Sequence, residues 1–329
     1  MLFLRVLQRQ VEVLIDVKMD IDLVYLWCDG NDPDWLEKKN AALKVLGKPP
    51  VKNAVNDCRF VQSDELMYSL RSVEKYAPWI RKIFIVTAGQ TPVWLNLDHP
   101  KIKMVDHKDI MPAEALPTFS STSIESCLPY IEGLSEYFLF ANDDMMFWNN
   151  VTPQDFFTSD GKPICRMRQK IHNKNYKHLY GYMVSKAYRM VKEKFGLNMP
   201  YFPHHNIDVY RKTYFIDCIN DFKQDFDRTT LMQFREFDAV QRSIVTYYMF
   251  ARGLGQAKLI EKPKWNPFFK EESIYAKCLI KKLKGLDKKD CKFVCVNDSE
   301  KTQHIDRVYM QDILRQKFPE KSSFELAAS

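Results

Sequence analysis

Short apolar runs alternate with polar, helix-like stretches from Ile21 to about Trp148. The runs that have strand length and end in a polar turn are Ile21–Trp27, Ile83–Thr87, Ile102–Val105 and Tyr137–Ala141. Between them, Ser63–Tyr76 and Ser123–Leu128 are predicted to be helical, the first because its apolar residues fall on one helical face. Strands that alternate with helices in this way predict an α/β fold with a mainly parallel sheet covered on both faces.

The pattern is less regular from Val151 onward. Helices are predicted over Tyr182–Phe195, Asp227–Ala251 and Arg307–Lys317. No internal repeat, low-complexity tract or linker marks a boundary. We therefore expect a single α/β domain over residues 21–329, in which a helix-rich C-terminal half completes a site begun by the first half. Residues 1–20 carry apolar side chains at helical spacing and are predicted to form an N-terminal helix.

Composition and charge narrow the class of protein without deciding it. Apolar residues make up 46% and charged residues 28% of the 329 positions, as in ordinary globular proteins. The net charge of +7 is too small to predict a nucleic-acid partner, although it suits an anionic substrate or membrane surface. Lys277–Lys292 is rich in lysine and is either a solvated helix face or a contact for a polyanion or a membrane. The N-terminal helix either packs on the body or attaches peripherally to a membrane.

The eight cysteines are scattered, and no CxxC pair with a histidine partner predicts a zinc site. We interpret them all as reduced thiols. Charged residues interrupt the N-terminal stretch, which therefore has no secretory signal pattern. These observations predict a cytoplasmic protein, with the inner face of the cell membrane as the alternative location.

Acidic residues follow two of the predicted strands, at the edge where sheets of this kind bind ligands. Asp29, Gly30 and Asp32 lie in the turn after the first strand, where Gly30 permits unusual backbone angles. Asn142–Asp144 follows the fourth strand directly, and adjacent acids there are costly unless they are solvated, paired or bound to a cation. Carboxylate oxygens suit a divalent ion that bridges a diphosphate. The alternatives are ordinary turn and helix-capping roles.

A third polar cluster lies in the second half of the chain. His205 can act as a general base near neutral pH, and Arg211 and Arg235 can hold phosphate groups. A histidine pair such as His204 and His205 is often structural, so this cluster alone does not establish catalysis. The chain has no GxGxxG, GxxxxGK[ST], GxSxG or HExxH pattern, which argues against a dinucleotide site, a P-loop, that hydrolase class and a zinc protease.

Stretches in all three clusters resemble the four conserved regions of the Stealth family, in order and over nearly the whole chain. IDLVYLWCDGNDPDW resembles the first region, and Arg59–Trp148, with DELMYSLRSVEKYAPWIRKIFIVTAGQTPVWLN, HKDIMP, LPTFSS and IEGLSEYFLFANDDMMF, resembles the second. HNIDVYRK and FREFDAV, between His205 and Val240, resemble the third. FVCVND and FPEKSSFE, at Phe293–Asp298 and Phe318–Glu325, resemble the fourth.

The family includes bacterial capsular polysaccharide phosphotransferases and the catalytic part of the lysosomal-enzyme N-acetylglucosamine-1-phosphotransferase. The resemblance implies an α/β fold similar to GT-A glycosyltransferases, a UDP-sugar donor, a polysaccharide or oligosaccharide acceptor, and Mg²⁺ or Mn²⁺. It implies transfer of a hexose- or N-acetylhexosamine-1-phosphate to an acceptor hydroxyl, with release of UMP. Residues 21–150 would form the nucleotide-sugar and metal half, and 151–329 the acceptor and catalytic half. Self-association and a capsule-assembly partner are further interpretations.

Under this resemblance the candidate residues take specific roles in phosphoryl transfer. His205 is predicted to be the base that takes the acceptor proton, with Asp238 as its orienter or its rival. Arg235 is predicted to stabilise charge on the transferring group, and Asp143 and Asp144 to hold the cation. The residues predicted to bind substrate are Asp29, Gly30, Asp32, Arg71, Asn142, Arg211, Asn297 and Asp298.

The chain departs from the family pattern at a few positions. Cys28 stands where an aliphatic residue is usual, Ala88 replaces a common Asp or Asn, and Ile207 replaces a Pro. These changes bear on the donor sugar and the acceptor more than on the reaction type. Two alternatives stay open: a GT-A-like glycosyltransferase that forms a glycosidic bond, and a catalytically silent carbohydrate-binding or scaffold protein.

Overall fold

A computed structural model describes residues 19–47, 49–56, 59–171, 176, 178–260, 268–269, 291–296 and 302–327. The predicted N-terminal helix lies almost wholly outside these residues. So do most of the lysine-rich stretch Lys277–Lys292 and the two predicted site residues Asn297 and Asp298.

The described strands are β1 (Ile21–Leu26), β2 (Ile83–Thr87), β3 (Ile102–Asp106), β4 (Tyr137–Asn142), β5 (Met145–Phe147), β6 (Ile164–Lys170), β7 (Tyr201–Pro203), β8 (Asp208–Arg211), β9 (Gln256–Leu259), β10 (Phe268–Phe269) and β11 (Phe293–Val296). The described α-helices are α2 (Pro33–Val45), α3 (Lys52–Val55), α4 (Glu65–Tyr76), α5 (His107–Ile110), α6 (Ser121–Glu125), α7 (Leu179–Phe195), α8 (Lys212–Asp221), α9 (Lys223–Thr230), α10 (Ser243–Ala251) and α12 (His304–Lys317). Short 3-10 helices occupy Ala113–Ala115, Leu128–Tyr130 and Pro153–Asp155.

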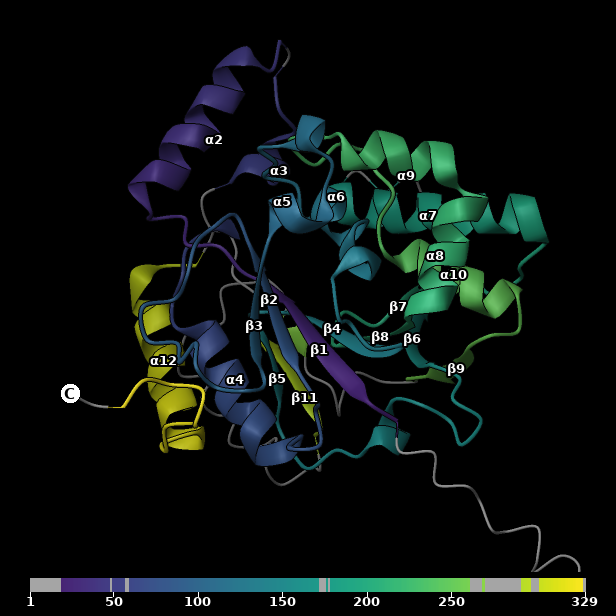
Figure 1. The fold of residues 1–329 in the computed structure, drawn as a ribbon. Helices are drawn as coiled ribbons and strands as arrows, with labels where there is room; N and C mark the ends of the chain where they lie inside the picture. The colour runs from purple at the N-terminus through teal and green to yellow at the C-terminus, as the bar shows by residue number, and fades with distance from the viewer. Residues whose placement is uncertain are drawn as a thin grey trace, which may run out of the picture.

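A five-stranded sheet in the order β3-β2-β1-β4-β8 forms the centre of the molecule (Figure 1). The pairs β2–β3, β1–β2 and β1–β4 are parallel, and only the edge strand β8 runs antiparallel, beside β4. This arrangement confirms the predicted α/β fold with a mainly parallel sheet. Because β8 comes from the second half of the sequence, both halves contribute strands to one sheet.

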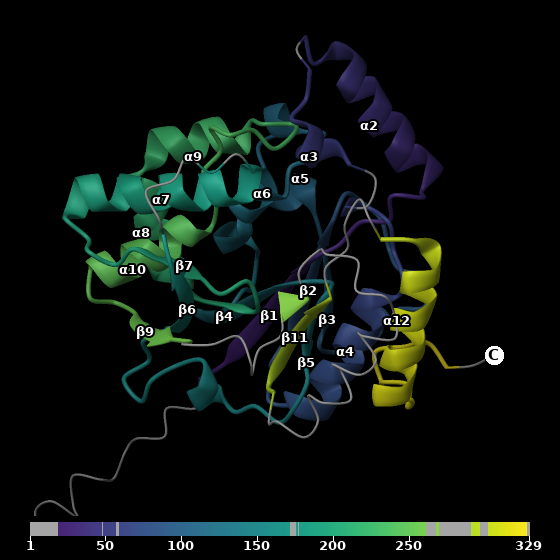
Figure 2. The same cartoon turned by 180° about the vertical axis from the view of Figure 1, so that it is seen from behind.

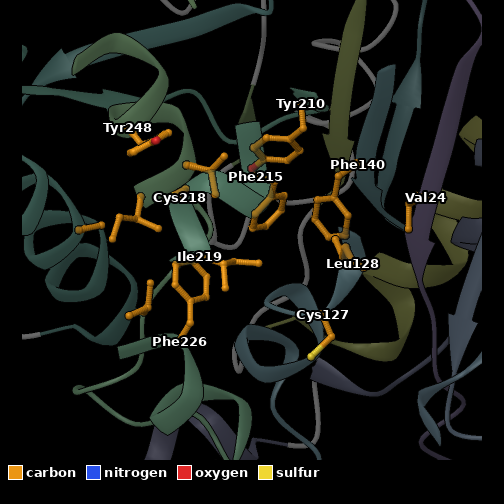
Figure 3. Close-up of a cluster of buried hydrophobic side chains, with 14 of the residues drawn as sticks. Val24, Cys127, Leu128, Phe140, Tyr210, Phe215, Cys218, Ile219, Phe226 and Tyr248 are labelled. Carbon is orange, nitrogen blue, oxygen red and sulfur yellow. The ribbon is translucent and has the colours of Figure 1, made fainter. Parts of the chain in front are cut away.

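The two faces of the sheet bury different side chains because successive residues of a strand point to opposite sides. On β1, Leu23 and Tyr25 pack with α4, whereas Val24 packs into a larger cluster with residues of α7, α8 and α10. Both views place α4 and α12 on one side of the sheet and α7, α8 and α10 on the other (Figures 1 and 2). Figure 3 shows the larger cluster, in which Phe140 of β4 faces Leu128 and Phe215.

Two small sheets complete the fold, in the orders β10-β11-β5 and β7-β6-β9. In the first, β11 runs antiparallel to β5, and Cys295 lies opposite Met145. This pairing brings a C-terminal segment next to the acidic turn that precedes β5. Within the described residues, no helix is long and apolar enough to cross a membrane.

The predicted continuous helix Asp227–Ala251 is wrong. Helix α9 ends at Thr230 and α10 begins at Ser243, and the residues between them form a loop. Side-chain and backbone groups of the first half hold this loop: Ser123 Oγ donates to Met232 O at 2.8 Å, and Phe119 N donates to Gln233 O at 2.7 Å. These long-range bonds replace bonds that a helix would have made within itself.

Candidate active site

The loops that follow β1 and β4 emerge side by side from the sheet. Leu26 pairs with Asn142 in parallel register, so the next residues of both strands, up to Asp29 and Asp144, extend beyond the same edge. This is the carboxyl edge, where parallel sheets bind their ligands. The proximity that the sequence suggested for the first two acidic clusters is therefore observed.

Two glutamines, which the sequence analysis missed, hold the turn after β1, and Gln62 also joins it to the loop after β4. Gln62 Nε2 donates to Cys28 O at 2.6 Å and to Asp143 Oδ2 at 3.1 Å, and Trp27 Nε1 donates to Gln62 Oε1 at 3.0 Å. Gln90 binds the same turn from the end of β2. Its Nε2 donates to Asp29 O at 2.9 Å and its Oε1 accepts from Asp29 N at 3.0 Å. An amide group can donate and accept at once, which suits a side chain that joins two loops.

Asp32 caps helix α2. Its Oδ1 accepts hydrogen bonds from Asp34 N at 2.9 Å and Trp35 N at 3.3 Å, and its Oδ2 accepts one from Gln90 Nε2 at 2.8 Å. The side chain therefore has the capping role that was the alternative to donor binding. A part in donor binding stays a prediction for Asp32.

Gly30 lies where the turn approaches another backbone segment. Gly30 N donates to Phe60 O at 2.8 Å, and a Cβ atom at position 30 would lie 2.4 Å from Phe60 O and 2.4 Å from Phe60 Cβ. Here the glycine is required for close packing of the turn against Phe60.

The adjacent carboxylates of Asp143 and Asp144 are both half-buried. Burial raises the pKa of Asp143, although its hydrogen bond from Gln62 opposes this. Burial, together with the neighbouring Asp143 carboxylate, raises the pKa of Asp144 well above its usual range. Both effects disfavour the ionised form, so the pair is poised for a cation that would neutralise it.

Asp144 lacks the hydrogen bonds that satisfy a structural buried acid. Its Oδ2 accepts from Cys295 Sγ at 3.5 Å, but its buried Oδ1 has no hydrogen-bond partner among the described residues. Asp22, at the other end of β1, shows the contrast. Its carboxylate accepts two bonds from the Arg81 guanidinium, at 2.9 and 2.6 Å, and further bonds from Lys82 N and Ser135 N.

This donor set suits a hard divalent cation that takes part of its coordination from substrate. Mg²⁺ is commonly bound by one or two carboxylates, with water and substrate phosphates as its other ligands. Across the described parts of the chain, no three or more His, Cys, Asp or Glu side chains converge as a metal site. Asp143 and Asp144 stay the predicted ligands of such an ion.

His205 lies between β7 and β8, at the same edge of the sheet. Asp208 pairs with Phe140 of the antiparallel strand β4, so the chain before Asp208 runs toward the end of β4 that carries the acids. The His205 ring contacts Tyr180 edge to face, with 5.6 Å between centroids. Burial, together with the charges of Arg242 and Arg168, lowers the pKa of His205 well below its usual value. The ring is therefore neutral at physiological pH.

A network of charged side chains, which the sequence analysis did not predict, lies near His205. Arg242 Nε donates to Asp208 Oδ2 at 2.6 Å, and its Nη1 donates to Glu125 Oε1 at 3.0 Å. Burial alone would lower the pKa of Arg242, but Glu125 and Asp208 outweigh it and hold that pKa above its ordinary value. The charge of Arg242 also opposes the rise in the pKa of Cys295, the thiol that contacts Asp144, although burial keeps that pKa well above its ordinary value.

Arg235 lies in the same region, where the charge of Glu125 only partly offsets the effect of burial on its pKa. It donates a short hydrogen bond to the neutral Ser121 hydroxyl, and no carboxylate of the described chain forms an ion pair with it. Burial, with a contribution from the charge of Arg59, lowers the pKa of Arg235 to about 9. A half-buried guanidinium without a counterion favours the binding of an anion such as phosphate.

Three other predicted site residues have structural partners. Arg71 donates to both carboxylate oxygens of Glu325, at 2.8 and 2.6 Å. Arg211 binds Glu136 at 2.8 Å and lies beside Tyr137, at the opposite end of β4 from the acids.

Asp238 is exposed, and each of its carboxylate oxygens lies 2.7 Å from a cation, Lys186 or Arg228. The functional roles of Arg71, Arg211 and Asp238 stay predictions.

Comparisons with known proteins agree with this arrangement. The model of Stealth conserved region 1 matches residues 19–45, and that of conserved region 2 matches residues 59–165. These ranges include the acidic clusters, Gln62, Gln90 and Glu125. The third and fourth regions suggested by the sequence lie mainly outside them and stay predictions.

Characterised relatives extend the similarity beyond these regions. An exopolysaccharide phosphotransferase of Lactiplantibacillus plantarum is 30% identical over 93% of this chain and 96% of its own length. A capsular polysaccharide phosphotransferase of Streptococcus pneumoniae is 30% identical over 93% of this chain and 99% of its own. The chain belongs to the Stealth family, and both of these relatives are named phosphotransferases.

Other relatives are much longer than the region they share with this chain. An exopolysaccharide phosphotransferase of Streptomyces coelicolor is 51% identical over 44% of this chain, which spans 24% of that protein. The crystal structure of the galactosyltransferase LgtC in complex with donor and acceptor sugar analogs superposes with a TM-score of 0.44 at 12% identity, covering 91% of this chain and 95% of that one.

Proposed function

We propose that this protein transfers a hexose- or N-acetylhexosamine-1-phosphate from a UDP-sugar to a hydroxyl of a growing capsular polysaccharide or exopolysaccharide. One observation carries the proposal: a carboxylate pair with an unsatisfied oxygen follows β4 at the sheet edge where the paired strand β8 begins with Asp208, the partner of Arg242, and Arg235 forms no ion pair among the described residues. A diphosphate with its cation complements both halves of this arrangement. Family membership supports the same reaction.

The reaction follows from the chemistry of the groups. The acceptor hydroxyl oxygen attacks the phosphorus that carries the sugar, and the bond from that phosphorus to the oxygen bridging to UMP breaks. The acceptor proton passes to His205, UMP leaves, and the sugar phosphate becomes a phosphodiester. Phosphoryl transfer of this kind depends mainly on positioning and on neutralising charge.

Asp143 and Asp144 would hold Mg²⁺ or Mn²⁺, which when bound supplies positive charge to the diphosphate. Arg235 would bind the transferring phosphoryl group and neutralise its charge. The Gln62 and Gln90 contacts fix the turn that holds Asp29, so the donor meets a preorganised edge. His205 is neutral before the donor binds, and the negative charge of the diphosphate raises its basicity when the acceptor proton is released.

Product analysis tests the proposal directly. The protein is incubated with a panel of UDP-sugars, short capsular oligosaccharides and Mg²⁺, and the products are examined by ³¹P NMR and mass spectrometry. A phosphodiester with release of UMP supports the proposal. A glycoside with release of UDP would establish the glycosyltransferase alternative, and binding without turnover would establish a carbohydrate-binding protein.

A further inference from the structure

A serine hydroxyl links Arg235 to a buried carboxylate. Arg235 Nη2 donates a hydrogen bond to Ser121 Oγ at the start of α6, and Ser121 Oγ donates to Glu125 Oε1 at 3.2 Å, one helical turn further on. A guanidinium only donates hydrogen bonds, so the hydroxyl must accept from Arg235 and direct its own proton toward Glu125. The bonds therefore run in one direction, from Arg235 through Ser121 to Glu125.

The carboxylate at the end of this series is shared with a second cation. Glu125 is 2% exposed, and the same Oε1 atom accepts from Arg242 Nη1 at 3.0 Å. Its other oxygen, Oε2, is buried and has no hydrogen-bond partner among the described residues. Arg242 is thus paired directly with Glu125, whereas Arg235 meets that carboxylate only through a neutral hydroxyl. Arg235 is oriented by this contact and keeps its own charge.

Two arginines with structural partners show the contrast. Arg81 donates to both carboxylate oxygens of Asp22, at 2.9 and 2.6 Å, and Arg71 donates to both oxygens of Glu325, at 2.8 and 2.6 Å. Such bidentate pairs neutralise the guanidinium and fix it in place at once. A serine hydroxyl can hold the guanidinium of Arg235 but cannot neutralise it.

The loop that carries Arg235 is held on the first half of the chain by other contacts. Helix α6 lies beside α9 in both views (Figures 1 and 2). Ser123 Oγ donates to Met232 O at 2.8 Å, and the ring of Phe119 stacks on that of Phe234, with 5.3 Å between centroids and 18° between planes. Because these contacts fix the backbone next to Arg235, its hydrogen bond orients a side chain and is not needed to place the loop.

We propose that Ser121 is a positioning residue that, with Glu125 behind it, fixes the orientation of the Arg235 guanidinium for binding a diphosphate. A cation that is already oriented loses less conformational freedom when the anion binds. A neutral hydroxyl is suited to this role, since a carboxylate at the same place would pair with Arg235 and compete with the anion. This inference rests on the proposed function and states how its phosphate-binding cation is prepared.

Binding of inorganic pyrophosphate in the presence of Mg²⁺, measured by isothermal titration calorimetry, tests this role. Ser121→Ala should raise the Kd about tenfold, the usual effect of losing a hydrogen bond to a charged group. Ser121→Thr should stay within about twofold of the wild type, because threonine keeps the hydroxyl. Ser121→Asp keeps a partner for Arg235 but takes up its charge, so its Kd should rise at least as much as that of Ser121→Ala.

Ser126→Ala is the matched control. Ser126 is a buried serine next to Glu125, and its Oγ donates to Thr122 O at 2.9 Å within the same segment. Its removal should leave the Kd unchanged, and thermal unfolding shows whether each variant is folded. A double-mutant cycle identifies the route of the effect: in an Arg235→Ala background, Ser121→Ala should change the Kd no further, because the serine acts through the arginine.

Several outcomes would overturn the inference. They are a wild-type Kd in folded Ser121→Ala or Ser121→Asp, a loss of affinity that persists in the Arg235→Ala background, and a wild-type protein that does not bind pyrophosphate. The product of the reaction is a separate question. A glycoside would refute sugar-phosphate transfer and leave these binding results valid, since the donor carries a diphosphate in both reactions. A phosphodiester product with an unchanged Kd would refute the role of Ser121 alone.

Discussion

Asp144 and Asp22 show how similar residues acquire different roles. Both are aspartates at the ends of neighbouring strands of one sheet, yet Asp22 is saturated with hydrogen bonds and Asp144 is not. An acid that is half-buried without such bonds destabilises the fold and is retained for what it binds. The missing hydrogen bonds are therefore the reason to propose that Asp144, and not Asp22, binds the cation.

Asp144→Asn should stabilise the protein while abolishing its activity. The pKa of Asp144 is raised in the fold, so the ionised carboxylate costs stability at neutral pH, and a neutral amide removes that cost. We expect Tm to rise by about 2 °C or more. Differential scanning calorimetry measures this change, and a titration with Mg²⁺ and UDP-sugar should stabilise the wild type alone. A lower Tm with retained turnover would contradict the assignment.

His205 should control the acid limb of the pH profile. Its pKa is lowered by burial, by Arg242 and Arg168, and also by His204 and Arg235, so the ring becomes protonated only well below the usual pH. The acid limb of the kcat/KM profile that is due to His205 therefore lies at a lower pH than the titration of an ordinary histidine. Arg168→Gln removes one positive neighbour and should move this limb to higher pH. Steady-state rates across pH, measured at constant ionic strength, provide the check.

Replacing the base itself gives the stronger test. His205→Gln keeps a similar side-chain size and should lower kcat by about 10²–10⁴-fold. Circular dichroism shows whether the variant is folded. Turnover close to the wild-type rate would exclude His205 as the base and leave Asp238 as the remaining candidate.

At the scale of the element, two segments hold the turn after β1 in place. Gln90 binds it from the end of β2, Gln62 from the segment before α4, and Phe60 packs against Gly30. The turn is thus fixed by side chains that lie far from it in the sequence. Its position over the sheet edge depends on all of them.

Gly30→Ala should therefore displace the turn. A methyl group 2.4 Å from a backbone oxygen cannot be accommodated without a shift of one segment. We expect kcat/KM to fall about 10²-fold, the effect of misplacing a site by an ångström or so. Gly253→Ala is the control, because its φ of +68° strains an alanine while open space surrounds it. It should lower Tm and leave kcat/KM near the wild-type value.

The sequence predicted those elements whose pattern is local. Strands β1 to β4 and helices α4 and α7 have clear apolar runs or helical spacing, and they are found within a few residues of the predicted bounds. Strands β5 and β11 are too short to show a period and exist because they pair with each other across the chain. The same dependence on contacts between distant residues decides which residues of the candidate site could be predicted.

The acids were found because they follow strands directly. Gln62, Gln90 and Glu125 were missed because an isolated amide or acid has no pattern until the fold brings its partners together. The split of the predicted helix Asp227–Ala251 has the same origin, since bonds from Phe119 and Ser123 hold its middle as a loop.

For the whole molecule, the C-terminal segment closes the fold on the side of α4. Arg71 donates to Glu325 and, at 2.8 Å, to Phe318 O, while Leu326 N donates to Trp94 O at 2.8 Å. The side chains of Arg71 and Glu325 are only 10% and 3% exposed. This clamp joins residues more than 230 positions apart.

Removing one partner of this pair should cost about 3 kcal/mol, because it leaves a buried charge uncompensated. Arg71→Ala and Glu325→Ala should lower the free energy of unfolding by similar amounts, as measured in urea. The donor KM decides whether Arg71 also meets the diphosphate. Because its guanidinium is engaged with Glu325, we expect that KM to change by no more than about twofold in either variant. An increase in the donor KM in Arg71→Ala but not in Glu325→Ala would show that Arg71 contacts the diphosphate directly.

The pairing of β4 with β8 has a practical consequence for anyone who divides this chain. A fragment that ends near residue 150 would contain β4 with β1 but without β8. The backbone groups from Phe138 to Phe140 would then be unpaired at the edge of the sheet. Phe138 and Phe140 are fully buried in the intact protein, so the fragment would present apolar rings beside unpaired strand hydrogen bonds. Such an edge templates aggregation. The two halves should therefore be insoluble when they are expressed separately. They should become soluble, as a complex, only when both are produced in the same cell.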